Sequence, residues 1–515
     1  MCEDLMARIR KEDLFKKIMD PEDCIKFFKN GQNLGWSGFT TVGYPKAVPI
    51  ALAEFVEKNS LQGQLKFNLF VGASAGTETE DRWARNNMID RRWPYASGPA
   101  LRKGVNDGKI RMGDKHLSMF AQDLKYGFYT RENGGRLDIA IIEASAIDEH
   151  GNIILSGAVG AAPEIIDVAD RVIVEINTVL PSFEGMHDIV PTDLPPARQV
   201  IPITNVRQRV GTPYVSVDES KILAIVESRH RDNGASLPET DSISSTIAGH
   251  IIDFFSNEVS AGRLPRNLLP LQSGVGGIAN AVVAGLVSSP FENLTVFTEV
   301  LQDSFLPFID SGKCEYLNCT SLTLSNKGFS QWWERFEFYK DKVLLRPQQI
   351  SNNPEVIRRL GVIAMNTPVE FDIFGHANST HVGGTKMLNG IGGSGDFERN
   401  AYLSIMHCPS VRGTATDPLG ISGVVPKVPH CDHTEHDLDV LVTEQGLADL
   451  RGLSPWDRAR AIIDNCAHPE YRSYLHDYLD RAITTTGGHH QPHLLRECYK
   501  IYESLEEHGT MRFWR

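Results

Sequence analysis

The 515-residue chain carries 52 Lys and Arg residues against 65 Asp and Glu residues, a formal net charge of -13 at pH 7. Nucleic acid binds through a basic surface, so this charge argues against nucleic acid as the main partner. The 8 cysteines show no CxxC spacing, and no apolar run reaches the ~18 residues that would cross a bilayer. These features predict a globular intracellular chain of about two to four domains with reduced thiols and no membrane partner.

Short apolar runs that end in small or polar residues recur along the chain, as is typical of strands buried on both faces of a sheet. They lie at residues 67–71, 139–142, 172–176, 223–226, 294–297, 371–374 and 440–442. Helical spacing appears between them, for example at Ile243, Ile247 and Ile251, and Ser454-Pro455 is typical of a helix start. The alternation predicts an α/β fold with mainly parallel sheets. We expect one domain over residues 1–215 and a second over residues 216–515.

Polar residues that follow the predicted strands are candidates for a site, because ligands bind beyond the carboxyl ends of parallel strands. Four glutamates have this position: Glu143, Glu175, Glu299 and Glu444. A glutamate at a strand end can serve as nucleophile, general base or structural hydrogen-bond acceptor. The residues alone do not rank the four.

Two glycine-rich stretches, residues 272–278 and 388–396, are candidates for backbone contacts with a ligand. Glycines let backbone N–H groups approach a ligand closely, and a following helix adds a positive end. Neither stretch continues into Gly-Lys-Ser/Thr, so neither is a P-loop. The alternative is a tight turn that packs a helix onto a strand.

Two further patterns favour a structural role. Ser74 lies in a GxSxG match after the run at 67–71, where a hydrolase has its nucleophile elbow, but the acidic segment 77–81 that follows lacks an apolar face. We therefore interpret residues 72–76 as a small-residue turn beside a ligand. The His-rich segments at 430–436 and 489–493 contain no HExxH motif, and we predict no metal site.

Longer motifs carry a resemblance to a known family. They include Ser37-Gly38-Phe39-Thr40, Gly43-Tyr44-Pro45-Lys46, Leu271-Gln272-Ser273-Gly274-Val275-Gly276, Thr298-Glu299-Val300-Leu301-Gln302-Asp303, Ser351-Asn352-Asn353-Pro354 and residues 389–396 and 442–454. In order and spacing they are similar to the acetyl-CoA hydrolase/transferase family, from about residue 25 to the last residues given. Within it, the chain most resembles eukaryotic acetyl-CoA hydrolases and succinyl-CoA:acetate CoA-transferases.

The resemblance implies two similar domains of the CoA-transferase fold with the active site between them. It implies that Glu299 is the nucleophile and that the backbone amides of Val275 and Gly393 form an oxyanion hole. Asn352 would orient the acyl or carboxylate group, and Glu444 would support the nucleophile or bind near the thiol end of CoA.

The remaining implied contacts concern CoA and the small acid. The CoA contacts are Gly274, Val275, Gly276, Gly277, Ile278, Asn389 and Gly393, with Arg412 as the candidate for the CoA phosphates. Many family members have Asn where this chain has Gly277. Ser74 and Ser97 would line the small-acid pocket, and Arg231 is the nearest candidate for the carboxylate-binding arginine, with Arg229 and Asn233 beside it.

The resemblance therefore predicts a CoA-transferase that moves CoA between a short acyl-CoA and a small carboxylate by ping-pong catalysis through a glutamyl-CoA thioester. The alternative is an acetyl-CoA hydrolase, in which water is the acceptor. A CoA-binding regulator would not need Glu299, and a sugar-phosphate isomerase would not need the long motifs.

The same resemblance predicts acyl-CoA and small carboxylates as the partners, no permanently bound cofactor, and a homodimer. It places the protein in the mitochondrion, although acidic residues such as Glu3 and Asp4 make the N-terminal segment atypical of a presequence. The cytosol is the alternative compartment.

Overall fold

A computed structural model describes residues 3–234 and 240–514. The first half forms one large sheet whose successive neighbours run parallel, in the order β4-β3-β2-β1-β5-β7-β8. Its strands are β1 (Asn33–Trp36), β2 (Phe67–Val71), β3 (Ile89–Trp93), β4 (Arg111–Met112), β5 (Leu137–Ile147), β7 (Ala169–Asn177) and β8 (Ile222–Ser228). β6 (Ile153–Leu155) adds an antiparallel pair to β5.

Helices cover both faces of this sheet, which explains why its strands read as continuous apolar runs. Along β5, Ile139 and Ile141 pack in a core with α2 (Ala47–Lys58), whereas Ala140 and Ile142 pack in another core with α5 (Leu117–Lys125) and α6 (Ala162–Val168). Side chains alternate between faces along a strand, so every residue of the run is buried.

The predicted domain boundary at residue 215 precedes a strand that belongs to the first sheet. β8 pairs in parallel with β7, and Val174 lies opposite Ile225. The first sheet therefore extends to Ser228, because the apolar run at 223–226 completes it and does not begin the second one.

The second half forms a second mainly parallel sheet from two groups of strands, β13-β11-β9 and β14-β19-β23-β24. Leu271 joins them, because it bridges in parallel to both Val296 and Ile363. The strands are β9 (Leu294–Phe297), β11 (Cys314–Cys319), β13 (Val343–Leu345), β14 (Ile363–Asn366), β19 (Leu403–His407), β23 (Val440–Thr443) and the antiparallel β24 (Gly446–Asp449). Together the two sheets confirm the predicted α/β fold with mainly parallel strands.

The run at 371–374 lies outside both large sheets. Its strand β15 (Glu370–Asp372) pairs instead with β16 (Ala377–Asn378) and β22 (Val424–Val425) in a small sheet. The predicted helices are present as α7 (Ser242–Ser260), α8 (Gly277–Ser288) and α15 (Pro455–Cys466), and Ser454 caps α15 by accepting from the Asp457 N–H.

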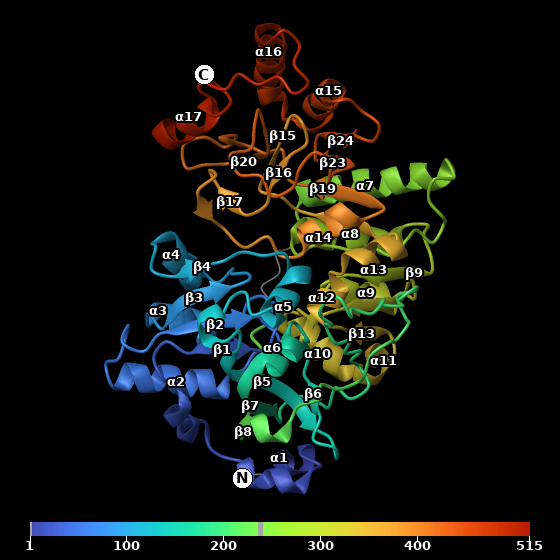
Figure 1. The fold of residues 1–515 in the computed structure, drawn as a ribbon. Helices are drawn as coiled ribbons and strands as arrows, with labels where there is room; N and C mark the ends of the chain where they lie inside the picture. Colours follow the sequence, from blue (N-terminus) through green and yellow to red (C-terminus); the bar gives the residue numbers. More distant parts are fainter. Residues whose placement is uncertain (1–2, 235–239, 515) are drawn as a thin grey trace.

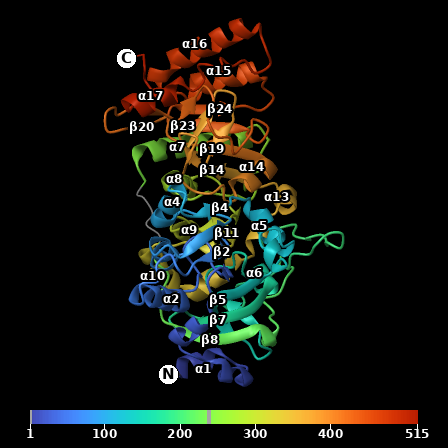
Figure 2. The same cartoon turned by 60° about the vertical axis from the view of Figure 1, so that its left-hand side comes forward.

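The molecule is elongated, and its first and last described helices lie at opposite ends (Figure 1). α1 (Glu3–Arg8) lies beside the first sheet, whereas α15, α16 (Pro469–Thr486) and α17 (Lys500–His508) lie at the far end of the second domain in both views (Figures 1 and 2). No helix among the residues described here has the length and apolar character needed to cross a bilayer.

Candidate active site

A cavity of about 690 Å³ receives side chains from both domains. The first domain contributes Phe39, Thr40, Ala73, Tyr95, Ser97 and Leu117 to its wall. The second contributes Glu299 and Val300, residues on both predicted glycine stretches, and further lining residues that include Val369, Val382, Arg412 and Ile421. The predicted position of the site, between two domains, therefore coincides with a real hollow.

Glu299 lies in this cavity because it closely follows a strand end: β9 ends at Phe297, and Thr298 and Glu299 come next. Its Oε1 atom is buried and has no hydrogen-bond partner among the described residues. Burial, with a smaller contribution from the negative charge of Asp396, raises the pKa of Glu299 to about 8, and the Asn352 side chain opposes the rise. A desolvated carboxylate with a free oxygen is suited to nucleophilic attack, since no donor has to be displaced.

Gly393 lies against this carboxylate at a distance that no side chain would permit. A Cβ atom on Gly393 would lie 2.2 Å from Glu299 Oε1 and 1.9 Å from Asn352 Oδ1. Asn352 itself is completely buried, and its Nδ2 donates to the Gln348 carbonyl at 2.9 Å. The structure thus brings together three of the predicted residues, Glu299, Gly393 and Asn352.

The two predicted oxyanion donors both have free backbone N–H groups. Neither the Val275 nor the Gly393 N–H makes a hydrogen bond with another described residue, and both residues line the cavity. Gln302 fixes the first loop, because its Nε2 donates to the Gly274 carbonyl at 2.8 Å and its Oε1 accepts from the Gly276 N–H at 3.3 Å. Gly276 has φ +133°, which favours glycine.

The predicted CoA-binding residues divide into two groups. Gly274, Val275, Asn389, Gly393 and Arg412 line the cavity. Gly276, Gly277 and Ile278 do not line it: they form the start of α8, and Ile278 is buried in the core. Arg412 donates to the carbonyl of another lining residue, Val369, at 2.7 Å.

The predicted small-acid residues are only partly assembled. Ser97 lines the cavity, whereas Ser74 is buried behind Ala73 and its hydroxyl has no partner among the described residues. Arg231 is exposed and does not line the cavity. The residue after it, Asp232, does not line the cavity either and forms an ion pair with Lys46 at 2.8 Å.

The other strand-end glutamates have structural partners. Glu444 lies outside the cavity lining and accepts from the Ser410 N–H at 2.9 Å; burial would raise its pKa, but the hydrogen bonds from Ser410 outweigh burial and hold it below the usual value. Glu175 accepts three N–H groups at the start of α2, and Glu143 pairs with the buried Lys46. These contacts favour Glu299 among the four.

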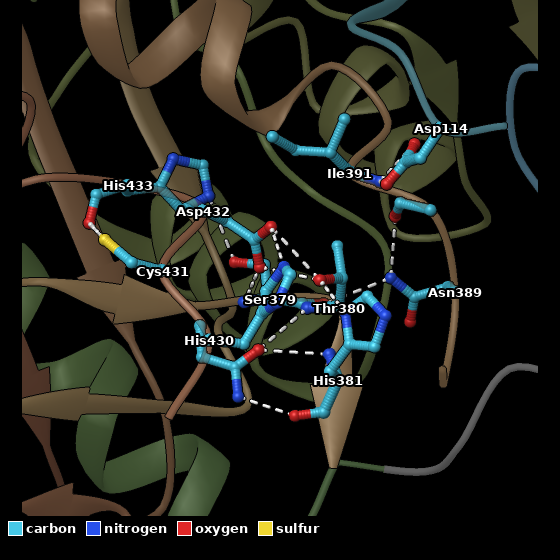
Figure 3. A network of polar contacts seen from close by, with 12 residues as sticks. Asp114, Ser379, Thr380, His381, Asn389, Ile391, His430, Cys431, Asp432 and His433 are labelled. Carbon is cyan, nitrogen blue, oxygen red and sulfur yellow. Dashed lines mark hydrogen bonds and ion pairs between the residues drawn. The ribbon is translucent and has the colours of Figure 1, made fainter. Parts of the chain in front are cut away.

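His430 and His433 belong to a polar network beside the second glycine stretch (Figure 3). Asp432 accepts from the Ser379 N–H at 2.6 Å and from the Thr380 hydroxyl, and Asn389 Nδ2 donates to the Ser379 carbonyl at 3.1 Å. Across residues 3–234 and 240–514, no group of three or more His, Cys, Asp or Glu side chains is arranged to hold a metal ion.

Three residues of the site were not anticipated. Tyr95 forms part of the wall from the first domain, and burial followed by the charge of Glu299 raises its pKa above the usual value. Gln302 hydrogen-bonds to the first glycine stretch, and Asp396, at the end of the second, accepts from Ser118 of the first domain. Gln302 and Asp396 do lie within the motifs quoted for the family, but nothing in their spacing shows which atoms they contact.

Comparison with known proteins agrees with this geometry. Residues 3–227 match the model of the acetyl-CoA hydrolase/transferase N-terminal domain, and residues 327–479 match that of the C-terminal domain of the same family. The chain therefore belongs to the acetyl-CoA hydrolase/transferase family and is an enzyme of that family.

Its curated relatives include proteins of nearly the same length. It is 55% identical over 513 residues to the acetyl-CoA hydrolase of Schizosaccharomyces pombe, with 99% of this chain and 98% of the relative covered. It is 56% identical over 513 residues to the acetyl-CoA hydrolase of Saccharomyces cerevisiae, with 99% and 97% covered.

Solved structures share the fold at low sequence identity. An M31G mutant of RipA matches with a TM-score of 0.71 at 22% identity, covering 92% of this chain and 98% of that one. The 4-hydroxybutyrate CoA-transferase of Porphyromonas gingivalis matches with a TM-score of 0.61 at 19% identity, covering 91% and 99%.

Proposed function

We propose that this protein hydrolyses acetyl-CoA through a covalent intermediate on Glu299. The observation that carries the proposal is the buried Glu299 Oε1 atom, which has no hydrogen-bond partner among the described residues, lies against Gly393 and belongs to a cavity wall with two unengaged backbone N–H groups. The relatives at 55% and 56% identity, which are named acetyl-CoA hydrolase, support water over a carboxylate as the acceptor. In this respect the alternative raised by the sequence has more support than the transferase prediction.

The chemistry balances without a redox cofactor. The Glu299 carboxylate attacks the acetyl carbonyl, the C–S bond breaks, and CoA thiolate leaves an acetyl-glutamyl anhydride. The thiolate attacks the glutamyl carbonyl, which releases acetate and forms a glutamyl-CoA thioester. Water then attacks that carbonyl, so that one proton passes to the CoA thiolate, the other to solvent, and the carboxylate is regenerated. The Val275 and Gly393 N–H groups are the donors for the oxyanions.

The wall near Glu299 suits a methyl group better than a second charge. Phe39, Ala73, Leu117 and Val300 make it apolar. Among the described residues that line the cavity, Arg412 has the one cationic side chain, and it donates to the Val369 carbonyl. A succinyl carboxylate beside the apolar residues would lack a cationic partner, which is costly in a desolvated site.

One observation favours transfer to a carboxylate as the second candidate function. The Ser74 hydroxyl is buried without a described partner next to the cavity-lining Ala73, and Ser97 lies in the wall itself. The Ser97 hydroxyl would orient a small acid such as acetate for attack on glutamyl-CoA in place of water, and the Ser74 hydroxyl would add a second donor if it turned toward the cavity.

The experiment measures thiol release and CoA transfer from acetyl-CoA in parallel, with water alone and with added acetate, propionate or succinate. Hydrolysis predicts a thiol-release rate that does not depend on the added acid. Transfer predicts new acyl-CoA products and little thiol release without an acid. Compartment and oligomeric state stay predictions.

Borohydride tests the shared intermediate, because it reduces a thioester but not a carboxylate. Incubation with acetyl-CoA and borohydride should convert Glu299 to an alcohol, and peptide mass spectrometry should place the change on the peptide that contains Thr298 and Val300. A label on Glu143, Glu175 or Glu444, or no label that depends on acetyl-CoA, would contradict the assignment.

A further inference from the structure

A short segment of the first domain, residues 114–118, lies along the second glycine stretch, residues 388–396. The Ile391 N–H donates to both carboxylate oxygens of Asp114, at 3.0 and 2.9 Å (Figure 3). The Leu117 N–H donates to the Gly392 carbonyl at 3.3 Å. Three consecutive contacts end at Ser118, whose N–H donates to Asp396 at 2.9 Å and whose hydroxyl donates to the other oxygen of that carboxylate.

These contacts bracket Gly393, whose carbonyl accepts from the Phe397 N–H at 3.0 Å but whose own N–H makes no hydrogen bond with another described residue. The residues on its amino side, Ile391 and Gly392, and the residue three positions after it, Asp396, are each bound to the first domain. Residues 114–118 and the second glycine stretch are also tightly packed, because a Cβ on Gly395 would lie 2.4 Å from His116 Cε1.

The same segment is also linked to Asn352, the second residue beside Glu299, through Gln348. Gln348 Nε2 donates to the Leu117 carbonyl at 3.3 Å. Its own carbonyl accepts from the Asn352 N–H at 2.8 Å and from Asn352 Nδ2 at 2.9 Å. Residues 114–118 are therefore linked to both neighbours of Glu299, Gly393 and Asn352.

We propose that residues 114–118 are an interdomain clamp that positions the Gly393 N–H and Asn352 against Glu299. Asp114, Ser118 and Asp396 are positioning residues, since they act through the loop and not on the substrate. The proposal deepens the proposed function and rests on it, because Glu299 is the group that the clamp serves.

The charges around the clamp supply a readout that a purely structural contact would not change. The charged groups near Asp396 are Glu299 and Arg399, and those near Asp114 are Asp432 and His430. Two further titratable groups lie close by: Tyr95, beside Glu299 and Asp114, and His116 of the clamp, against Gly395. Asp396 contributes to the raised pKa of Glu299. Replacing it with Asn removes that negative charge and should lower the pH at which Glu299 becomes an active carboxylate.

The experiment compares Asp396→Asn, Ser118→Ala and Asp114→Asn with a matched control. Ser404 also donates through both its N–H, to Asp439 at 3.0 Å, and its hydroxyl, to the Asp437 carbonyl at 2.7 Å, but all three residues lie in the second domain and Ser404 is near the amino end of β19. Ser404→Ala should therefore keep the wild-type rate.

We expect each clamp variant to lower kcat for thiol release by about 10- to 100-fold with little change in KM, because a misplacement near 1 Å costs about 10²-fold. Asp396→Asn should also move the acid limb of the pH–kcat profile to lower pH. Ser118→Ala combined with Asp396→Asn should cost less than the product of the single effects, since the two side chains share one contact.

Hydrogen exchange of the peptide covering residues 388–396 keeps the clamp testable if the proposed function fails. All three variants should speed exchange in this peptide, and Ser404→Ala should not. Wild-type protein without turnover or label would refute the proposed function, and the exchange result alone would then decide on the clamp. The clamp proposal would be overturned if the variants left exchange unchanged, or if they kept the wild-type kcat and Asp396→Asn did not shift the acid limb.

Discussion

The closest contact in the site gives the sharpest prediction, for Gly393→Ala. Gly393 has φ -97° and ψ -1°, which alanine adopts without strain, so any effect comes from the added methyl group. That group would lie 1.9 Å from Asn352 Oδ1 and 2.2 Å from Glu299 Oε1, whereas ordinary contact begins at 3.4 Å. Either the loop retreats or both side chains move, and the separation from the Glu299 oxygen must grow by 1.2 Å, the difference between 3.4 and 2.2 Å.

A retreat of this size predicts a large kinetic effect and a smaller effect on stability. A misplacement of about 1 Å can cost about 10²-fold in rate, and loss of one oxyanion donor costs about 10²–10³-fold. Overpacking a buried site costs about 1–3 kcal/mol. We expect kcat/KM for acetyl-CoA to fall by at least about 10²-fold in a variant that still folds and still binds CoA.

Thiol release, thermal unfolding and calorimetric CoA binding measure the three quantities. Gly249→Ala in α7 is the matched control, because a Cβ there has no atom within 4 Å. It should keep full activity and gain up to about 1 kcal/mol of stability from helix propensity. A folded Gly393→Ala variant with wild-type kcat/KM would refute the contact between Gly393 and Glu299.

Three further predictions concern charge. Since burial raises the pKa of Glu299 to about 8, folding favours its protonated form; that stabilisation is complete below pH 4.5 and is lost as pH rises through 8. Glu299→Gln should thus be inactive yet gain thermal stability over wild type between pH 5 and 8, and a constant difference would contradict this. Lys46→Met leaves two buried carboxylates without their cation and should cost about 3–5 kcal/mol in urea unfolding; a loss below 1 kcal/mol would argue against the buried pair. Arg512, which donates to Asp417, lowers the pKa of that carboxyl, so Arg512→Met should lower the Tm at pH 7 but not at acid pH, where Asp417 is protonated.

Local features of the site were readable from the sequence. The apolar runs at β2 and β9 predicted both strands with their observed ends, because burial on both faces leaves a run without polar interruptions. Two polar residues, Thr298 and Glu299, follow β9, and the carboxyl end of a parallel strand is where such a fold places a ligand site.

Features that depend on docking were not readable. Asp114 and Ile391 are 277 positions apart, and their contact exists because two domains meet. The same limit explains the boundary at 215: the run at 223–226 identifies a strand, but not the sheet that receives it. For Ser74, the turn was predicted, yet the direction of the hydroxyl depends on packing around Ala73.

The extent of the first sheet has a consequence for biosynthesis. All of its strands lie within residues 33–228, so the sheet is complete in the nascent chain before Glu299 has left the ribosome. Domains generally fold as units, with the N-terminal one first during synthesis. Ile203 and Val206, which pack with Phe297 and Leu344, would stay uncovered in that interval. The Glu299 carboxylate is thus placed late, against a wall that has already folded.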